Sequence, residues 1–249
     1  MRVLITNDDG FGAPGIVALT RAVRDAGHEA VVAAPAEEAS GMSAALTAVT
    51  VGGRIAVTRH PDGYAVAASP AYIVMLAAHG AFGPPPDVVL SGINRGANAG
   101  NAVLYSGTVG AALTAAAHGL PAISVSLDVL TTTRGSATFV IPPDDVLHWA
   151  TAAEMAVDLL DKAAADGTIL NLNVPDLPAP PPLRTASLAV GGQARMTVAE
   201  SGEDFLRTAF LPVTEAPAPG TDLATLAEGY ATLTVVTPPA VPRQRPPSD

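Results

Sequence analysis

The first thirty-five residues constrain the fold more than any other part of the chain. Residues 3–5 (VLI) form a short, continuous apolar run, which is typical of a strand buried on both faces of a parallel sheet. A turn follows, and a helical pattern begins at Pro14 and ends before Gly27. Residues 30–33 are again apolar. This order of strand, helix and strand predicts a βαβ unit and therefore an α/β fold.

The same alternation continues along the chain. Residues 47–51 and 54–58 flank Gly52-Gly53 and predict a hairpin, whereas the polar, glycine-rich segment 91–101 predicts a long loop. Further strands are expected at 87–90, 122–127 and 168–174, and further helices from residue 69, over 106–118 and over 144–165.

The composition of the sequence changes after residue 175. Prolines cluster at 178–182, and short strand candidates follow at 184–190, 205–211 and 231–236. We therefore expect an α/β body over residues 1–175 and a β-rich extension over 176–236. The proline-rich residues 237–249 predict a mobile tail.

Charge and composition exclude several classes of function. A formal net charge of −10 argues against binding of long nucleic acid, because that affinity comes mostly from Lys and Arg. The chain has no cysteine, which excludes disulfides, thiolate zinc sites and a cysteine nucleophile. No signal-peptide pattern opens the sequence and no apolar stretch reaches membrane length, so a cytoplasmic location without membrane contact is expected.

Adjacent acidic residues follow the first predicted strand. Asp8 and Asp9 repel each other when both are ionised, and a hard divalent cation makes such a pair favourable. The pair thus indicates Mg²⁺ or Mn²⁺. Taken alone, the Asn-Asp-Asp-Gly sequence is more typical of a turn than of a metal site.

Other polar segments are expected near this pair, because ligands of doubly wound sheets bind beyond the carboxyl ends of the strands. Ser40, Asn94 and Asn98 offer oxygen or amide groups for a metal or a phosphate, and each also suits a turn. Residues 106–108 (SGT) open a predicted helix, where free backbone N–H groups favour an anion. A simple helix cap is the alternative there.

Several common motifs are absent from the sequence. Neither the glycine fingerprint of dinucleotide-binding proteins nor a P-loop occurs, and the five histidines lack the spacing of a zinc protease. Trp149 lies in a helical pattern and is expected to serve packing.

Seven segments, taken together and in order, carry a resemblance that covers most of the chain. The chain resembles the SurE family of survival-protein nucleotidases through NDDGFGAPGI (7–16), SGMSAALT (40–47), SGINRGANAGN (91–101), YSGTVGAA (105–112), SVSLD (124–128), LNLNVPDLP (170–178) and GTDLATLAEGY (220–230). The co-occurrence of these segments is far more specific than any single one.

This resemblance implies a fold and an activity. The fold is a Rossmann-like, three-layer α/β/α structure with a doubly wound, mostly parallel sheet. A C-terminal β-hairpin extension completes the body and exchanges between subunits, which gives homodimers or homotetramers. The activity implied is hydrolysis of nucleoside 5′- and 3′-monophosphates, with one divalent metal ion, Mg²⁺ or Mn²⁺, per subunit.

The resemblance also implies roles for individual residues. The metal ligands would be Asp8, Asp9, Ser40 and Asn94, and the phosphate contacts would be Asn98, Ser106, Gly107 and Thr108. The catalytic residues would be Asp8, Asp9, Asn98 and Ser106. As a hypothesis, water activated by the metal attacks phosphorus in line, and Asp8 or Asp9 is the base.

Some alternatives remain open. Tyr72 stands where the family usually has an acidic residue, so a phosphatase for a sugar phosphate or a biosynthetic intermediate is one rival. A second rival is a non-catalytic nucleotide- or metal-binding homologue. A third, a dinucleotide-dependent oxidoreductase, lacks its glycine fingerprint.

Overall fold

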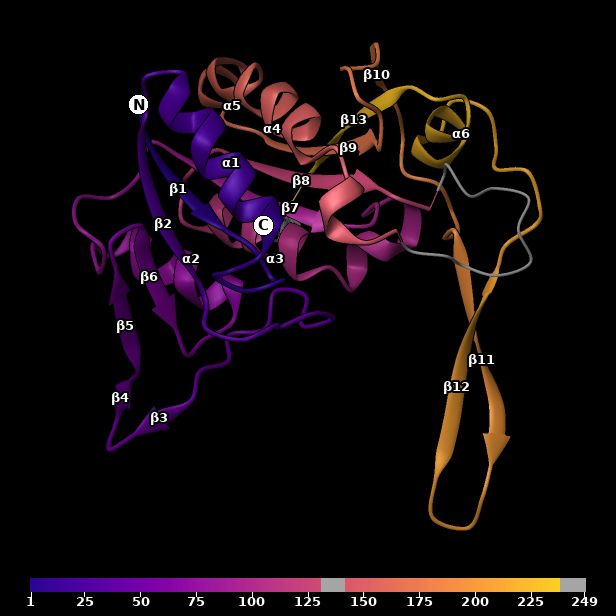
Figure 1. Ribbon diagram of the computed structural model, residues 1–249, viewed down its shortest axis with the longest axis horizontal. Coiled ribbons are helices and arrows are strands. Elements are labelled where there is room, and N and C mark those ends of the chain that lie inside the picture. Colours follow the sequence, from indigo (N-terminus) through magenta and orange to yellow (C-terminus); the bar gives the residue numbers. More distant parts are fainter. Residues whose placement is uncertain (131–141, 238–249) are drawn as a thin grey trace, which may run out of the picture.

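A large sheet forms the centre of the protein. The computed structural model describes residues 1–130 and 142–237. The sheet has nine strands in the order β10-β13-β9-β8-β7-β1-β2-β6-β5 (Figure 1). Its five central strands are mutually parallel, namely β1 (Arg2–Thr6), β2 (Glu29–Pro35), β7 (Val88–Arg95), β8 (Ala122–Asp128) and β9 (Ile169–Pro175).

Helices cover both faces of this sheet (Figure 1). One face is covered by α1 (Pro14–Asp25), α4 (Trp149–Val157) and α5 (Leu160–Asp166). The other is covered by α2 (Pro70–Ala78) and α3 (Gly107–Ala117). The buried strands are apolar on both faces because a helix layer lies on each side. The predicted three-layer, doubly wound α/β/α fold is confirmed.

The strand order reverses at β1. The chain passes from β1 to β2 on one side and later returns to place β7 on the other side of β1. In a doubly wound sheet, the crevice beyond the carboxyl ends of the strands at such a point is the usual ligand site. Residues 7–10 and the end of β7 therefore meet where a site is expected.

The predicted boundaries were wrong in two places. Strand β7 continues through Arg95, whereas residues 91–101 were expected to be a loop. The single helix expected over 144–165 is three elements, a 3-10 turn η3 (Asp144–Val146) followed by α4 and α5. The backbone N–H of His148 donates to Asp176 Oδ1 at 2.8 Å, which fixes the extended link between η3 and α4.

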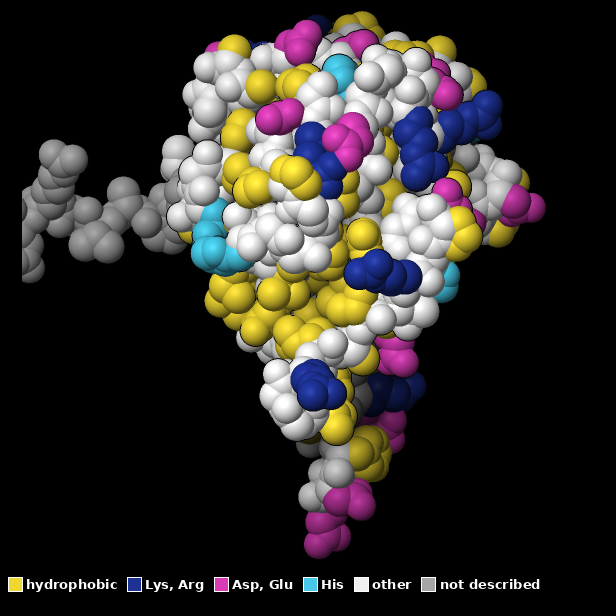
Figure 2. Space-filling model, turned by 90° about the vertical axis from the view of Figure 1, so that its left-hand side faces the viewer, with side chains coloured by type: hydrophobic (Ala, Val, Ile, Leu, Met, Phe, Trp, Pro, Cys, Tyr) yellow, Lys and Arg dark blue, Asp and Glu magenta, His cyan; other side chains and the backbone are white. Residues whose placement is uncertain are grey.

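The edge beyond β2 carries two hairpins. The expected one joins β3 (Thr50–Val51) to β4 (Arg54–Ile55), and a second, which was not expected, joins β5 (Val57–His60) to β6 (Gly63–Val66). Exposed apolar side chains in this region include Leu46, Val49 and Val51. Figure 2 shows hydrophobic side chains gathered on this side of the molecule.

The C-terminal extension adds to the sheet and also departs from it. β13 (Ala231–Val236) pairs antiparallel with β9, and β10 (Leu183–Thr185) pairs with β13. Helix α6 (Asp222–Ala227) was not predicted. β11 (Ala194–Ser201) and β12 (Leu206–Pro212) form a long hairpin that extends away from the body (Figure 1). Most of the predicted tail lies outside the described residues.

None of the described helices is long and apolar enough to cross a lipid bilayer.

Candidate functional site

The turn after β1 places the two acidic residues at the switch point of the sheet. The Asn7 side chain closes this turn, because its Oδ1 accepts the Gly10 N–H at 3.2 Å and its Nδ2 donates to the Gly10 carbonyl at 2.9 Å. The turn expected for this sequence is therefore confirmed. The turn is what directs Asp8 and Asp9 into the crevice.

Asp8 is almost completely buried against the N-terminus of α3. Its side chain is 3% exposed, and its Oδ1 accepts a hydrogen bond from the Thr108 hydroxyl. A Cβ atom at Gly107 would lie only 2.8 Å from Asp8 Oδ2, so only glycine allows this approach. Burial raises the pKa of Asp8, whereas the Thr108 hydroxyl and the backbone N–H groups of Thr108 and Gly107 lower it.

The ionised form of Asp9 is disfavoured by its surroundings. Burial, and after it the adjacent charge of Asp8, raises the pKa of Asp9 to about 7, while the backbone N–H of Arg95 lowers it. Within the described residues, neither carboxylate forms an ion pair with a Lys, Arg or His side chain. Two desolvated neighbouring carboxylates of this kind favour a bound cation.

Oxygen atoms from the end of β7 and from the loop that carries Ser40 are suited to share a cation with the two carboxylates. Asn94 Nδ2 donates to the Gly96 carbonyl at 2.7 Å, which turns Asn94 Oδ1 away from that bond and leaves it for a ligand. The backbone N–H of Ala39 donates to the Asp8 carbonyl at 2.7 Å and ties the Ser40 loop to the acidic turn. Two carboxylates, an amide oxygen and a hydroxyl are hard oxygen ligands, which suits Mg²⁺ or Mn²⁺.

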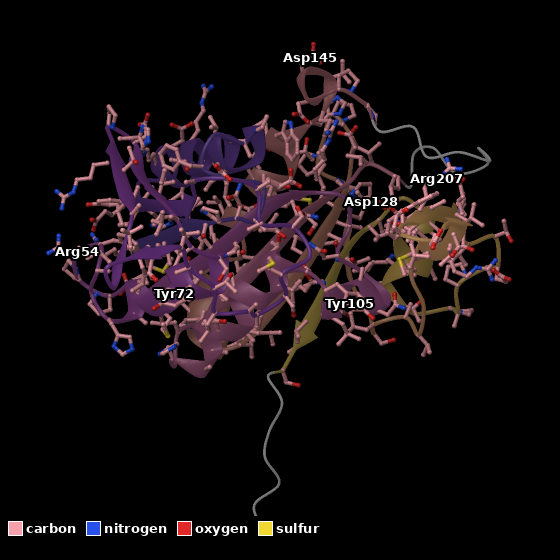
Figure 3. The ribbon with its side chains drawn as sticks, turned by 90° about the horizontal axis from the view of Figure 1, so that it is seen from below. Arg54, Tyr72, Tyr105, Asp128, Asp145 and Arg207 are labelled. Atoms are coloured by element: carbon pink, nitrogen blue, oxygen red, sulfur yellow. The ribbon has the colours of Figure 1, made fainter. Side chains whose placement is uncertain are left out.

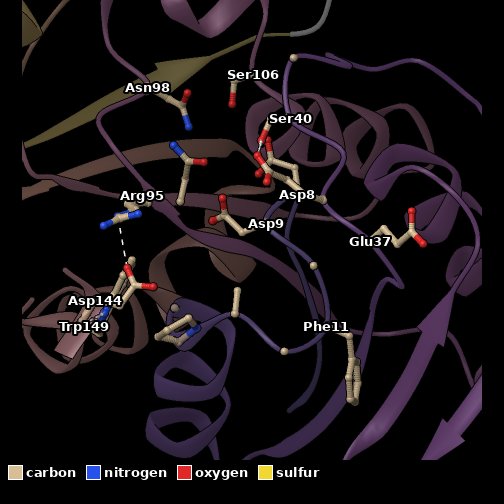
Figure 4. A pocket seen from close by; sticks show the side chains of 18 of the residues that line it. Asp8, Asp9, Phe11, Glu37, Ser40, Arg95, Asn98, Ser106, Asp144 and Trp149 are labelled. Carbon is tan, nitrogen blue, oxygen red and sulfur yellow. Dashed lines mark hydrogen bonds and ion pairs between the residues drawn. The ribbon is translucent and has the colours of Figure 1, made fainter. Parts of the chain in front are cut away.

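One pocket of about 790 Å³ brings most of the predicted site residues together (Figure 4). Among its lining residues are Asp8, Asp9, Ser40, Asn94, Asn98 and Ser106. Gly107 and Thr108 do not line it, because they lie behind Asp8 and direct their donors to that carboxylate. The phosphate contacts predicted for these two residues therefore stay a prediction.

Ser106 fills the role of a helix cap as well as lining the pocket. Its Oγ accepts the Val109 N–H at 3.0 Å, and its side chain is 7% exposed. The start of α3 thus faces the pocket through Ser106 and faces Asp8 through Gly107 and Thr108.

Several pocket residues were not found by sequence reasoning. Arg95 Nε lies 3.2 Å from Asp144 Oδ1, and this ion pair stands beside Asp9 at one side of the pocket (Figure 4). Phe11 and Tyr105 also line the pocket. Phe11, Arg95 and Tyr105 lie in segments that carry the family resemblance, but no role was predicted for them. The contact between Arg95 and Asp144 joins segments far apart in the sequence, so no local pattern indicates it.

Two other aromatic residues, Trp149 and Tyr72, bear on predictions made from the sequence. Trp149 packs in the core, as expected, and its edge lines the pocket while Nε1 donates to the Asp144 carbonyl at 3.1 Å. Tyr72 lies on α2 and is not among the pocket residues, and Figure 3 shows it well separated from Tyr105. The position of Tyr72 therefore gives no support to a substrate other than a nucleotide.

Fold and site together define a doubly wound α/β protein with an acidic, oxygen-lined pocket at its switch point. The sequence model of the family described as Survival protein SurE matches residues 3–197. The chain belongs to the SurE family, as the resemblance predicted.

Individual relatives agree with this assignment. Proteins named 5'-nucleotidase SurE from Xanthomonas campestris pv. campestris (strain B100) and Xanthomonas oryzae pv. oryzae (strain PXO99A) are each 45% identical over 183 residues. Each match covers 71% of this chain and 64% of the relative's length. The crystal structure of the SurE protein from Aquifex aeolicus superposes with a TM-score of 0.77 at 27% identity, and the match covers 97% of this chain and 95% of that one.

The contact between Thr108 and Asp8 yields a prediction about cation binding. Thr108→Val keeps the shape of the side chain but removes the donor that favours the ionised carboxylate, so the pKa of Asp8 rises further and protons compete better with a cation. We expect Mn²⁺ affinity near pH 7, measured by calorimetry, to fall about tenfold. Thr114→Val is the matched control, because Thr114 Oγ1 bonds only the Gly110 carbonyl of its own helix. Equal effects of the two changes would contradict the assignment.

Proposed function

We propose that this protein is a divalent-metal-dependent phosphomonoesterase that hydrolyses nucleoside 5′- and 3′-monophosphates. One observation carries the proposal. A single pocket joins the buried pair Asp8-Asp9 to the polar side chains of Asn98 and Ser106 at the start of α3. The Xanthomonas relatives are named 5'-nucleotidase, which supports the part of the proposal that concerns nucleoside 5′-monophosphates.

Asp8, Asp9, Ser40 and Asn94 would hold one Mg²⁺ or Mn²⁺ ion per subunit. When bound, this cation supplies Lewis-acid polarisation of a phosphoryl oxygen and makes nearby water more acidic. It also offsets the repulsion that raises the pKa of Asp9. The donor set fits such an ion because all of its groups are oxygen ligands at the same end of the sheet.

Asp9 is better suited than Asp8 to take the proton from the attacking water. Thr108 and Gly107 pack against Asp8 and fix it, whereas Asp9 is partly exposed in the pocket, where water can reach it. A general base must lie within hydrogen-bond reach of the proton that it takes. Asn98 and Ser106 would bind the oxygens of the phosphoryl group and stabilise the charge that grows on them during in-line displacement.

The nucleoside would occupy the remaining volume of the pocket. Its capacity of about 790 Å³ lies within the range of small-molecule sites, roughly 300–1,000 Å³, and exceeds what a phosphate group alone requires. Tyr105 and Arg95 offer an aromatic ring and a cation at its rim. This arrangement favours a substrate with a planar or polar body attached to the phosphate.

A phosphomonoester screen with Mg²⁺ and with Mn²⁺ tests the proposal. We expect nucleoside monophosphates to rank first, chelation to abolish phosphate release, and Asp9→Asn to lower turnover about 100-fold or more through loss of the base. Asp25→Asn, at the exposed end of α1, is the control and should keep full activity.

Three other results of this screen would contradict parts of the proposal. Activity that survives thorough chelation contradicts the metal dependence. Preference for a sugar phosphate or another ester contradicts the nucleotidase assignment. Calorimetric binding of nucleotide without phosphate release indicates a non-catalytic homologue.

We also propose that the β11–β12 hairpin makes the contacts of a homodimer or homotetramer. Its strands pair with each other and extend from the body (Figure 1), and their apolar side chains Met196, Val198, Leu206 and Phe210 are each more than half exposed. A lone two-stranded hairpin is marginally stable in water, so this one gains stability from a second copy of the chain.

Light scattering after gel filtration tests the subunit contact. Met196 and Phe210 are directly opposite in the hairpin, so the double change to serine removes apolar area from one face. We expect the mass of a monomer for this variant and a multiple of it for the wild type. Thr197→Ser, on the same hairpin, should leave the mass unchanged. A monomeric wild type would contradict the proposal.

A further inference from the structure

Polar side chains line the interior of the sheet beneath the candidate site. Thr6, Ser91, Ser124, Asn171 and Thr234 are neighbours across five strands, from β1 through β7, β8 and β9 to β13. All five are buried, with exposures of 4% or less. A row of this kind is costly, because buried polar groups destabilise a core unless they are hydrogen-bonded.

A second row lies one pleat nearer the carboxyl ends of the strands. Ser126, Asn173 and Thr232 are neighbours in the ladder across β8, β9 and β13, and each is fully buried. Together the two rows cover the part of this sheet face that lies beyond the apolar contacts of α3.

These rows make a set of hydrogen bonds that converge on Asn98. The backbone N–H of Asn98 donates to Asn173 Oδ1 at 2.8 Å, and the Asn98 carbonyl accepts from Asn171 Nδ2 at 2.8 Å and from Asn173 Nδ2 at 3.2 Å. The Asn98 side chain donates through Nδ2 to Ser126 Oγ at 2.9 Å. Asn171 is fixed in turn by the Ser124 hydroxyl at 2.8 Å.

These hydrogen bonds leave two groups of the Asn98 side chain available to a ligand. Both backbone groups and one of the two Nδ2 protons are engaged, so the second Nδ2 proton and Oδ1 remain, on a residue that lines the pocket and is 7% exposed. A donor fixed in this way needs no reorganisation when charge develops on a bound oxyanion.

The polar side chains of the two rows differ in how well they are hydrogen-bonded. Thr232 and Thr234, on β13, have hydroxyl groups with no hydrogen-bond partner, although they stand beside Asn173 and Asn171. The hydrogen bonds are therefore concentrated on the residues that reach Asn98. Support of the strands alone does not explain this distribution.

We propose that Ser126, Asn171 and Asn173 are positioning residues that orient Asn98 toward the phosphoryl group of the substrate. The proposal depends on the proposed function, because it assigns their purpose through the contact between Asn98 and phosphate. The three residues touch neither the substrate nor the cation and act through Asn98.

A double-mutant cycle tests the proposal. Ser126→Ala removes the acceptor of the Asn98 side chain, and we expect kcat/KM for a nucleoside monophosphate to fall about tenfold or more, mainly through kcat. In an Asn98→Ala background the same change should alter kcat/KM less than about twofold, because its effect passes through Asn98. Thr232→Val is the matched control, since it removes a buried hydroxyl from the same row without a bond to Asn98, and it should keep wild-type kinetics.

A second measurement does not depend on catalysis. In ¹⁵N-labelled protein the side-chain amide of Asn98, identified by its loss in Asn98→Ala, should show slow exchange of the proton bonded to Ser126. Ser126→Ala should abolish that protection, whereas Thr232→Val should preserve it. If the wild type releases no phosphate, the proposed function fails, and this measurement still decides whether Ser126 fixes Asn98.

Two results would overturn the proposal. One is a loss of activity in Ser126→Ala that is equally large in the Asn98→Ala background, since that would indicate a general structural effect. The other is full activity in Asn98→Ala, which would remove the purpose of the positioning while leaving the phosphatase activity itself intact.

Discussion

The proximity of two buried carboxylates, Asp8 and Asp9, is the constraint on which the site depends. Burial raises the pKa values of both groups, and the charge of Asp8 raises that of Asp9 further, so the pair is costly in the ionised form when nothing positive is bound. The fold meets part of this cost with the hydroxyl of Thr108 and the N–H groups at the start of α3. In our proposal a cation meets the rest, and Asn94 and Ser40 line the same pocket and would share it.

Beneath the site, buried polar side chains again lower the stability of the fold while they hold a candidate site residue in place. Strands β8 and β9 pack apolar residues such as Val125 and Leu172 against one helix layer, but they turn Ser126, Asn171 and Asn173 toward the loop that carries Asn98. An apolar face would be the cheaper solution for a buried sheet. The hydrogen bonds that these side chains make with Asn98 lower the cost and fix the loop that bears a candidate phosphate ligand.

Sequence alone predicted the parts of the fold that depend on local pattern. The apolar runs that became β1, β2, β8 and β9 are strong signals because both faces of each strand are buried. The boundary of β7 was wrong because Ser91 and Asn94 are polar and stand beside glycines, a pattern typical of loops, although both residues pair with β8. The breaks around α4 also escaped prediction, since the bond between His148 and Asp176 joins segments far apart in the sequence.

The residues that line the pocket at the strand ends could be predicted from the sequence. The residues that hydrogen-bond to them and hold them in place could not. Asp8, Asp9, Asn94, Asn98 and Ser106 follow strands or open a helix, so the rule for doubly wound sheets already placed them together. Thr108 was expected to bind phosphate, and only the three-dimensional structure shows its hydroxyl on Asp8.

If one pocket holds both a cation and the phosphoryl group, the two ligands will be seen side by side in crystals. A crystal structure of the protein soaked with Mn²⁺ and inorganic phosphate, with anomalous data collected at the manganese edge, is the decisive measurement. We expect one manganese peak per subunit, coordinated by Asp8, Asp9, Asn94 and Ser40, with phosphate beside it on Asn98 and Ser106. A manganese peak elsewhere, or phosphate bound away from Asn98 while the cation site is filled, would contradict this expectation.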